Sequence, residues 1–275
     1  IYPVYDKLSK LPDCEVVVAN PGRVLLIARS KTKHDKIDAR VLGELLRTNF
    51  LPRSHMPDPE TREKRLIIND RVTYGLRRGE LQGSIRWLLK RRGIDVKKPF
   101  RAEGRKELRA LNLREIDIRL DELELVESIV KRLDKQISSI VSADQNAKLL
   151  NTLPGVAPYT ALFLSSALDD VSRFDDSKHA CAYLGLVPSL HQSGQVSFTG
   201  HITKTGNKWL RRNLIECARV AIRIDPHLRE SYQKLGHKRG GKKALIAIAR
   251  KLAAYAYWML RRNLTYEELA PWNGS

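Results

Sequence analysis

The chain has 275 residues, with 50 Lys and Arg against 31 Asp and Glu, and its formal net charge at pH 7 is +19. Its hydrophobic content of 42% is ordinary for a folded protein, so the charge does not indicate disorder, and the length allows about two domains. Because the charge is spread along the chain, we expect a polyanionic partner, with nucleic acid favoured over membrane and a plain basic surface as the alternative.

Cysteine usage and hydropathy predict a cytoplasmic protein. The three cysteines, Cys14, Cys181 and Cys217, lack metal-ligand spacing and fit a reducing compartment. The longest uncharged run, residues 149–168, is interrupted by prolines and glycine, so we expect a folded core there and no membrane partner.

The first 52 residues predict the C-terminal part of an α/β domain. A helix is expected over residues 3–12, and the apolar run 14–20 predicts a buried β-strand that Pro21-Gly22 ends. A basic loop then leads to a helix over residues 35–48. This order of strand, crossover and helix favours the α/β class.

An Asp-x-x-Asp pair, Asp35 and Asp38, lies at the start of that helix. Residues three apart share a helix face, so both carboxylates could bind one Mg²⁺ together with substrate phosphates. The alternative is structural, because acids stabilise a first helical turn and Lys33, Lys36 and Arg40 could pair with them.

Residues 53–146 predict an antiparallel helical coiled coil. After a proline-rich linker, helices are expected over residues 60–92 and 104–143, the second with apolar residues spaced by three, four and seven. We interpret this hairpin as a spacer or dimerisation arm.

Residues 147–275 predict a helical domain that carries the candidate chemistry. Residues 150–161 predict a helix, a Pro-Gly turn and a second helix, and the Gly155 backbone could approach a phosphate closely. Further helices are expected over residues 179–184, 207–224 and 244–262.

Between the first two of these helices, a loop rich in glycine and hydroxyl groups carries Ser193-Gly194. A serine hydroxyl near cations could attack a phosphodiester if a base takes its proton. His191 would share a face with Ser193 on extended backbone. The alternative is an ordinary Ser-Gly turn.

Basic residues of this domain are candidates for phosphate contact, with a solvated face as the alternative. They are Lys204, Lys208, Arg211, Arg212, Lys238, Arg239, Lys242 and Lys243.

Four segments together resemble a known family. They are KTKHDKIDARVLGELLR (31–47), LPGVAPYTA (153–161), RFDDSKHACAYLGLVPSLHQSG (173–194) and GHITKTGNKWLRRNLIECA (200–218). In this order they resemble the DEDD-type insertion-sequence transposases related to the Piv invertase, the insertion-sequence family one-ten, over nearly the whole chain.

The resemblance implies a mainly α fold in three parts: the end of a RuvC-like, RNase H-like nuclease domain (1–52), a coiled coil (53–146) and a transposase domain with a helix-hairpin-helix-like segment (147–275). It implies a DNA recombinase guided by a structured RNA and active as a homo-oligomer. Asp35 and Asp38 would be two of four acids that bind Mg²⁺, and Ser193 would form a covalent phosphoserine with DNA.

The first two acids of the family pattern would precede Ile1. We therefore expect an N-terminally truncated chain that is inactive as this fragment. Two other functions stay open: a non-catalytic nucleic-acid-binding remnant, and a structural coiled-coil adaptor.

Overall fold

The computed structural model describes residues 2–27, 35–193, 196–202 and 206–269, and these residues form two compact units, Ile1–Asp58 and Pro59–Ser275. The described residues are mostly helical, with one two-stranded sheet. The predicted mainly α fold is therefore confirmed. Of the described helices, none has both the length and the apolar character that crossing a bilayer requires.

The first unit contains α1 (Tyr2–Leu8), α2 (Pro21–Ile27) and α3 (Asp35–Arg47). The strand predicted at residues 14–20 was wrong. Within the described residues this stretch makes only an isolated bridge between Ala19 and Arg53. The Asn20 N–H donates to the Pro52 carbonyl at 2.8 Å, and the Ser54 N–H donates to the Val18 carbonyl at 2.7 Å. An apolar run becomes a strand only where a ladder continues, and here the pairing stops after one bridge.

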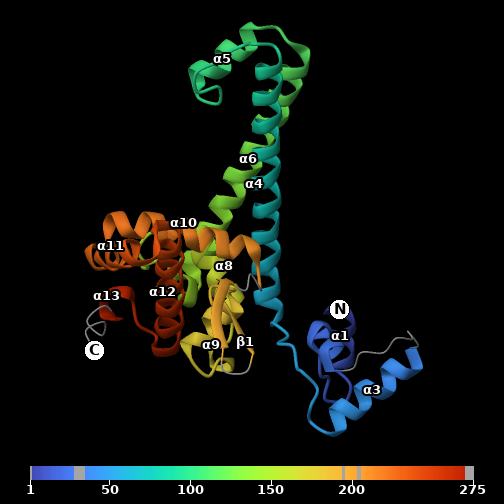
Figure 1. The fold of residues 1–275 in the computed structure, drawn as a ribbon. Coiled ribbons are helices and arrows are strands. Elements are labelled where there is room, and N and C mark those ends of the chain that lie inside the picture. The colour runs from blue at the N-terminus through green and yellow to red at the C-terminus, as the bar shows by residue number, and fades with distance from the viewer. Residues whose placement is uncertain (1, 28–34, 194–195, 203–205, 270–275) are drawn as a thin grey trace. The chain divides into compact units, whose positions relative to one another are not determined.

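The second unit begins with a long helical hairpin of α4 (Pro59–Arg91) and α6 (Arg114–Ala143), which lie side by side in Figure 1. Proline at the first position of α4, Glu60 in its first turn and basic residues in its last turn all suit a helix. Buried positions of α6 recur every three or four residues: Ile116, Leu120, Leu123, Val126, Val130, Leu133, Ile137 and Val141. The spacing agrees with the prediction, but the face differs in part, because Ile118 and Leu125, two of the apolar residues on which the prediction rested, are exposed.

The single helix predicted over residues 104–143 is in fact two helices. The short α5 (Ala102–Ala110) ends before Asn112, whose φ of 49° is left-handed, and α6 starts at Arg114. Asparagine tolerates this conformation, which turns the chain back onto the hairpin. Leu108 of α5 is buried in the same core as Ile116 and Leu120.

The remaining helices enclose a second core. They are α7 (Gln145–Leu150), α8 (Pro158–Leu168), the 3₁₀ helix η1 (Val171–Arg173), α9 (Ser177–Tyr183), α10 (Lys208–Ile224), α11 (Pro226–Arg239), α12 (Gly241–Arg262) and α13 (Tyr266–Leu269). Leu162 and Leu164 of α8 are fully buried, and Ile68 of α4 joins the same core. The coiled coil is thereby anchored to the C-terminal helices by shared apolar packing.

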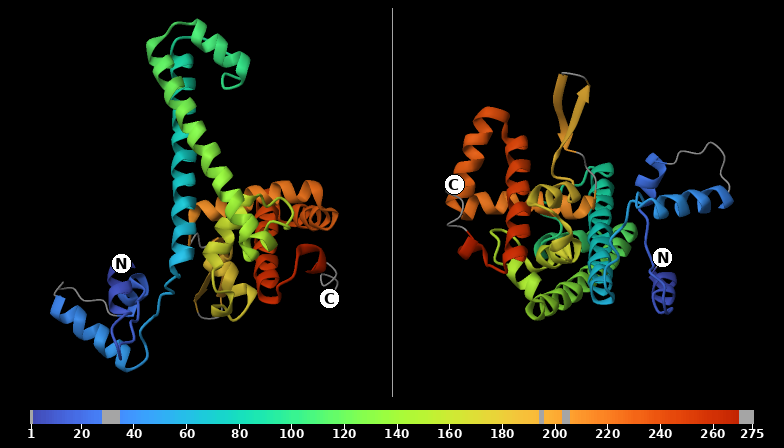
Figure 2. Two further views of the ribbon diagram at one scale, coloured as in Figure 1. Left: turned by 180° about the vertical axis from the view of Figure 1, so that it is seen from behind. Right: turned by 90° about the horizontal axis from the view of Figure 1, so that it is seen from below.

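The segment predicted as a Ser-Gly loop is largely a β-hairpin. Strands β1 (Pro188–Ser193) and β2 (Val196–Ile202) pair antiparallel, with Ser193 opposite Val196. This hairpin extends away from the helices in the right-hand view of Figure 2. In β2 the apolar residues Val196 and Phe198 alternate with the polar residues Ser197 and Thr199, which is the pattern of a strand.

Candidate nucleic-acid interface

The candidate nucleophile Ser193 is the last residue of β1. Its position at the end of a strand, next to the turn of the hairpin, is a backbone observation, because its side chain lies outside the described part of the chain. The other candidate catalytic residues belong to the first unit. Asp35 is the first residue of α3 and Asp38 follows one turn later, with an exposed side chain.

Among the described side chains, no cluster of three or more His, Cys, Asp or Glu could hold a metal ion. The side chain of Asp35 is outside this set. The binding of Mg²⁺ by Asp35 and Asp38 therefore stays a prediction.

The start of α10 is fixed by two residues of the motif Thr-Gly-Asn-Lys. Gly206 has a φ of +73°, and a Cβ there would lie 2.2 Å from the Tyr183 carbonyl oxygen. Only glycine fits this close approach. Next to it, the Asn207 side-chain oxygen accepts hydrogen bonds from the backbone N–H groups of Trp209 (2.9 Å) and Leu210 (3.2 Å). The Asn207 side chain is thus the N-cap of α10 and fixes where the helix begins.

This capped turn presents some of the predicted phosphate-binding cations and withholds another. Lys208 and Arg212 are exposed, and Lys208 lies over the Trp209 ring at 4.8 Å. Arg211 is only 9% exposed, which makes its guanidinium less available to a phosphate than the sequence suggested. Lys204 lies outside the described residues.

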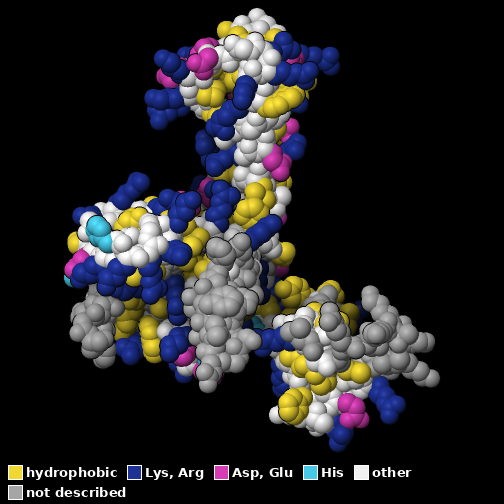
Figure 3. All heavy atoms as spheres, viewed as in Figure 1, with side chains coloured by type: hydrophobic (Ala, Val, Ile, Leu, Met, Phe, Trp, Pro, Cys, Tyr) yellow, Lys and Arg dark blue, Asp and Glu magenta, His cyan; other side chains and the backbone are white. Residues whose placement is uncertain are grey.

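The turn between α11 and α12 gathers four exposed cations, Lys238, Arg239, Lys242 and Lys243. Lys and Arg side chains are prominent over this part of the surface in Figure 3. Lys242 and Lys243 stand in the first turn of α12, where no acid occurs and where the helix dipole is positive. The Gly240 cap offers no side chain to the free N–H groups. Cations, dipole and open N–H groups therefore all favour an anion here.

Gly155 has a packing role that accounts for it without a ligand. It adopts a φ of +75°, and a Cβ there would lie 2.6 Å from the Cys217 carbonyl oxygen and 3.0 Å from the Ala221 nitrogen. The turn between α7 and α8 therefore rests directly on the backbone of α10. The predicted contact between Gly155 and phosphate stays a prediction.

The two buried cysteines do not offer a competing nucleophile. Burial raises the pKa of the Cys181 thiol and that of the Cys217 thiol above the ordinary value, so both stay protonated at neutral pH. A thiol reacts as the thiolate, and protonated thiols are inert.

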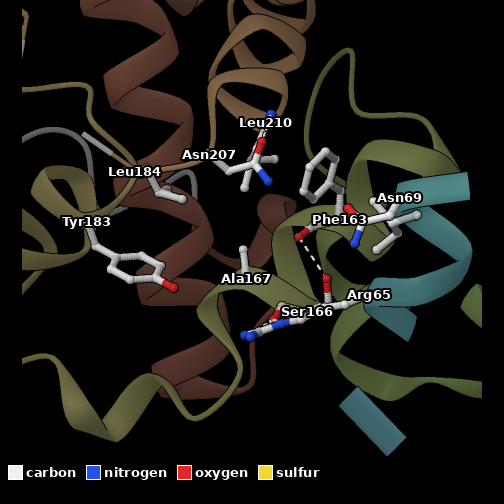
Figure 4. A pocket seen from close by; sticks show the side chains of 11 residues that line it. Arg65, Asn69, Phe163, Ser166, Ala167, Tyr183, Leu184, Asn207 and Leu210 are labelled. Atoms are coloured by element: carbon white, nitrogen blue, oxygen red, sulfur yellow. Dashed lines mark hydrogen bonds between the residues drawn. The ribbon is translucent and has the colours of Figure 1, made fainter. Parts of the chain in front are cut away.

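Sequence reasoning missed a pocket at the base of the hairpin, which Figure 4 shows from close by. Its lining comes from α4, α8, the end of α9 and the start of α10. Four distant segments supply one or two polar groups each, so no local motif could indicate it. The signal that existed was Gly206-Asn207, whose fixed geometry we interpreted only as a helix start.

Comparison with known proteins gives a match at the domain that contains this interface. Residues 147–233 match the family described as Transposase IS116/IS110/IS902. A probable family 20 transposase of Pseudomonas aeruginosa is 30% identical over 150 residues, which are 53% of this chain and 44% of that protein. A pilin gene-inverting protein of Moraxella bovis is 32% identical over 146 residues, 50% of this chain and 45% of that protein.

A longer alignment reaches into the first unit. The putative transposase y4rJ of Sinorhizobium fredii is 28% identical over 266 residues, 84% of this chain and 66% of that protein. The chain thus spans less than half the length of the Pseudomonas and Moraxella relatives and about two thirds of y4rJ. The resemblance to insertion-sequence transposases and to the pilin gene-inverting proteins is confirmed, while the DEDD set of acids and the N-terminal truncation stay predictions.

Proposed function

We propose, from the match of residues 147–233 to the IS116/IS110/IS902 transposase family, that this chain is a DNA recombinase of the transposase type whose nucleophile is Ser193. The proposal is best supported by the overlap between the matched segment and the candidate site residues. The matched segment contains the β-hairpin, whose first strand ends at Ser193. It also contains the capped start of α10 and the turn between α7 and α8 that packs on α10. The candidate nucleophile and two exposed cations, Lys208 and Arg212, therefore lie within the matched segment, and the α11–α12 cations follow it in the chain.

The chemistry assigned to Ser193 is a transesterification. The serine oxygen forms a bond to phosphorus as a deoxyribose oxygen leaves, and the product is a phosphoserine linked to DNA. The hydroxyl proton passes to a base, and the leaving oxygen takes up a proton. Because this exchange conserves the number of phosphoester bonds, it needs no nucleotide cofactor.

Asp35 and Asp38 are the residues proposed to hold Mg²⁺. Bound there, the ion would supply Lewis-acid polarisation of a phosphoryl oxygen. The two residues stand three apart at the start of α3, a spacing that suits carboxylates acting together on one ion. Since they belong to the first unit and Ser193 to the second, we also propose that the active form is a homo-oligomer, in which residues of different subunits can combine.

The exposed cations at the starts of α10 and α12 are proposed to hold DNA and a structured guide RNA by their phosphates. Each phosphate neutralised by a Lys or Arg contributes to the salt dependence of binding, about 0.9 in the slope of log K against log salt for duplex DNA. The double variant Lys242→Gln with Lys243→Gln should lower that slope by up to about 2. A matched pair on α6, Lys131→Gln with Lys135→Gln, should leave it nearly unchanged, because both lysines are exposed but lie outside the proposed interface.

The covalent step is tested by trapping. Purified protein is mixed with Mg²⁺, a candidate guide RNA and end-labelled target DNA, and adducts are separated on a denaturing gel. Ser193→Ala should abolish the adduct and leave DNA affinity unchanged. Ser197→Ala, a second serine of the same hairpin, should retain it.

An adduct that survives in Ser193→Ala refutes the nucleophile. If no adduct forms with the wild-type protein under any condition while salt-sensitive binding persists, the non-catalytic nucleic-acid-binding alternative is correct.

A further inference from the structure

The pocket at the base of the hairpin has an apolar floor. Ile68 of α4, Phe163 of α8, Leu184 and Leu210 line it, and all four are buried. Its volume is about 210 Å³. Pockets for drug-sized ligands are larger, roughly 300–1,000 Å³, so this one suits a single small ring system.

As far as the described residues form it, the rim of the pocket is polar and carries no carboxylate. Figure 4 shows Asn69, Tyr183 and Asn207 around the opening, with Arg65 beneath. The Asn69 amide makes no hydrogen bond within the described part of the chain. The Asn207 oxygen is committed to capping α10, which leaves its amide NH₂ as a donor.

Among the described residues that line the pocket, Arg65 alone is charged, and two of its five N–H donors are already used. Its Nε and one Nη donate to the Ser166 carbonyl oxygen at 3.0 and 2.7 Å. A phosphate site would require free cations or converging N–H groups, and the apolar floor offers neither. The lining therefore favours a flat ligand with apolar faces and a polar edge over an anion.

Tyr183, the aromatic residue at the rim, is packed against two side chains that do not line the pocket. The Arg173 guanidinium lies 4.5 Å from the centre of the Tyr183 ring, and the Phe174 ring lies 5.4 Å from it. Contacts of this kind restrict the motion of the Tyr183 ring and prepare it to meet a ligand at low entropic cost.

We propose that this pocket receives one unstacked nucleobase of a bound polynucleotide, with Asn69 and Asn207 contacting its polar edge. Unstacked bases are recognised in this way, by stacking on aromatic groups and by hydrogen bonds to their edges. Tyr183 and Leu184 precede the hairpin, and Gly206 and Asn207 follow it, so a captured base would anchor the strand at the base of the element that carries Ser193. The inference rests on the proposed polynucleotide binding but not on the nucleophile.

A thermodynamic cycle tests the proposal with two single-stranded 12-mers of equal charge, oligothymidylate and an abasic strand of tetrahydrofuran units. Affinities are measured by fluorescence anisotropy at low salt for the wild type, Ala167→Phe, which places a ring in the pocket, and Asn69→Ala, which removes one rim amide. Asn146→Ala is the matched control, because Asn146 is likewise an exposed helical asparagine. Thermal unfolding confirms that each variant is folded.

The wild type should bind the strand with bases about tenfold more tightly than the abasic strand, since one stacked base contributes on this scale. In Ala167→Phe this preference should largely vanish, while affinity for the abasic strand stays constant. Asn69→Ala should reduce the preference by severalfold and Asn146→Ala should not. Equal preference in all four proteins overturns the pocket assignment. If neither strand binds the wild type, the proposed polynucleotide binding itself fails.

Discussion

Replacing Gly155 by alanine should destabilise the second unit strongly, because the new methyl group has no room. The added Cβ would lie 2.6 Å from the Cys217 carbonyl oxygen and 3.0 Å from both the Ala221 nitrogen and the Val220 Cβ. All three atoms belong to α10, so the turn between α7 and α8 would have to move off that helix. Overpacking of this kind costs about 1–3 kcal/mol, and holding a non-glycine residue at a φ of +75° costs about 1–3 kcal/mol more.

The assay is thermal unfolding followed by circular dichroism at 222 nm. A loss of about 2–6 kcal/mol corresponds to a fall in Tm of about 4–24 °C for a unit of this size. Gly79→Ala is the matched control, since Gly79 lies in α4 with no atom within 4 Å of its added Cβ. That change should raise the free energy of unfolding by about 1 kcal/mol, because alanine is the better helix former. If Gly155→Ala unfolds within about 1 °C of the wild type, the turn does not rest on α10 as described.

Two further predictions concern the tyrosines near the C-terminus. The Tyr266 hydroxyl donates to the Asp225 carboxylate at 2.7 Å, so Tyr266→Phe should lower the free energy of unfolding in urea by about 1–3 kcal/mol, and a change below about 0.5 kcal/mol would contradict this. Burial raises the pKa of Tyr255 from 10.0 to about 12. A raised folded pKa gives stability that is complete below pH 10 and is lost as the pH rises towards 12, by up to about 3 kcal/mol. Urea unfolding between pH 9 and pH 11 should show this decline in the wild type and a smaller one in Tyr255→Phe; equal slopes would refute it.

Periodicity alone predicted most of the helices, because burial on one face repeats every three or four residues. It failed where a single residue interrupts a favourable pattern. Asn112 ends α5 although leucines flank it on both sides, and only its tolerance of a left-handed φ marks the break. The apolar run 14–20 failed for a different reason, since a strand depends on partners that local sequence does not specify.

In the candidate site, too, local features could be predicted from the sequence and tertiary features could not. The cap at Asn207 and the cations of the α11–α12 turn follow from local motifs, and the structure places them at helix starts. The burial of Arg211 and the contact of Gly155 with α10 depend on tertiary packing, which no spacing rule contains. The pocket assembled from α4, α8, α9 and α10 could be found only in three dimensions.

The close contact between Gly206 and the Tyr183 carbonyl means that the chain leaves the helical body and returns to it at one place. Leu184 and Leu186 are still buried in the core, and the strands β1 and β2 that follow them leave and return beside this contact. Lengthening such a segment costs little, because the free energy of loop closure grows only with the logarithm of its length. Evolution can thus change the reach of the β-hairpin, and with it the substrate geometry that the protein serves, without rebuilding the helices beneath.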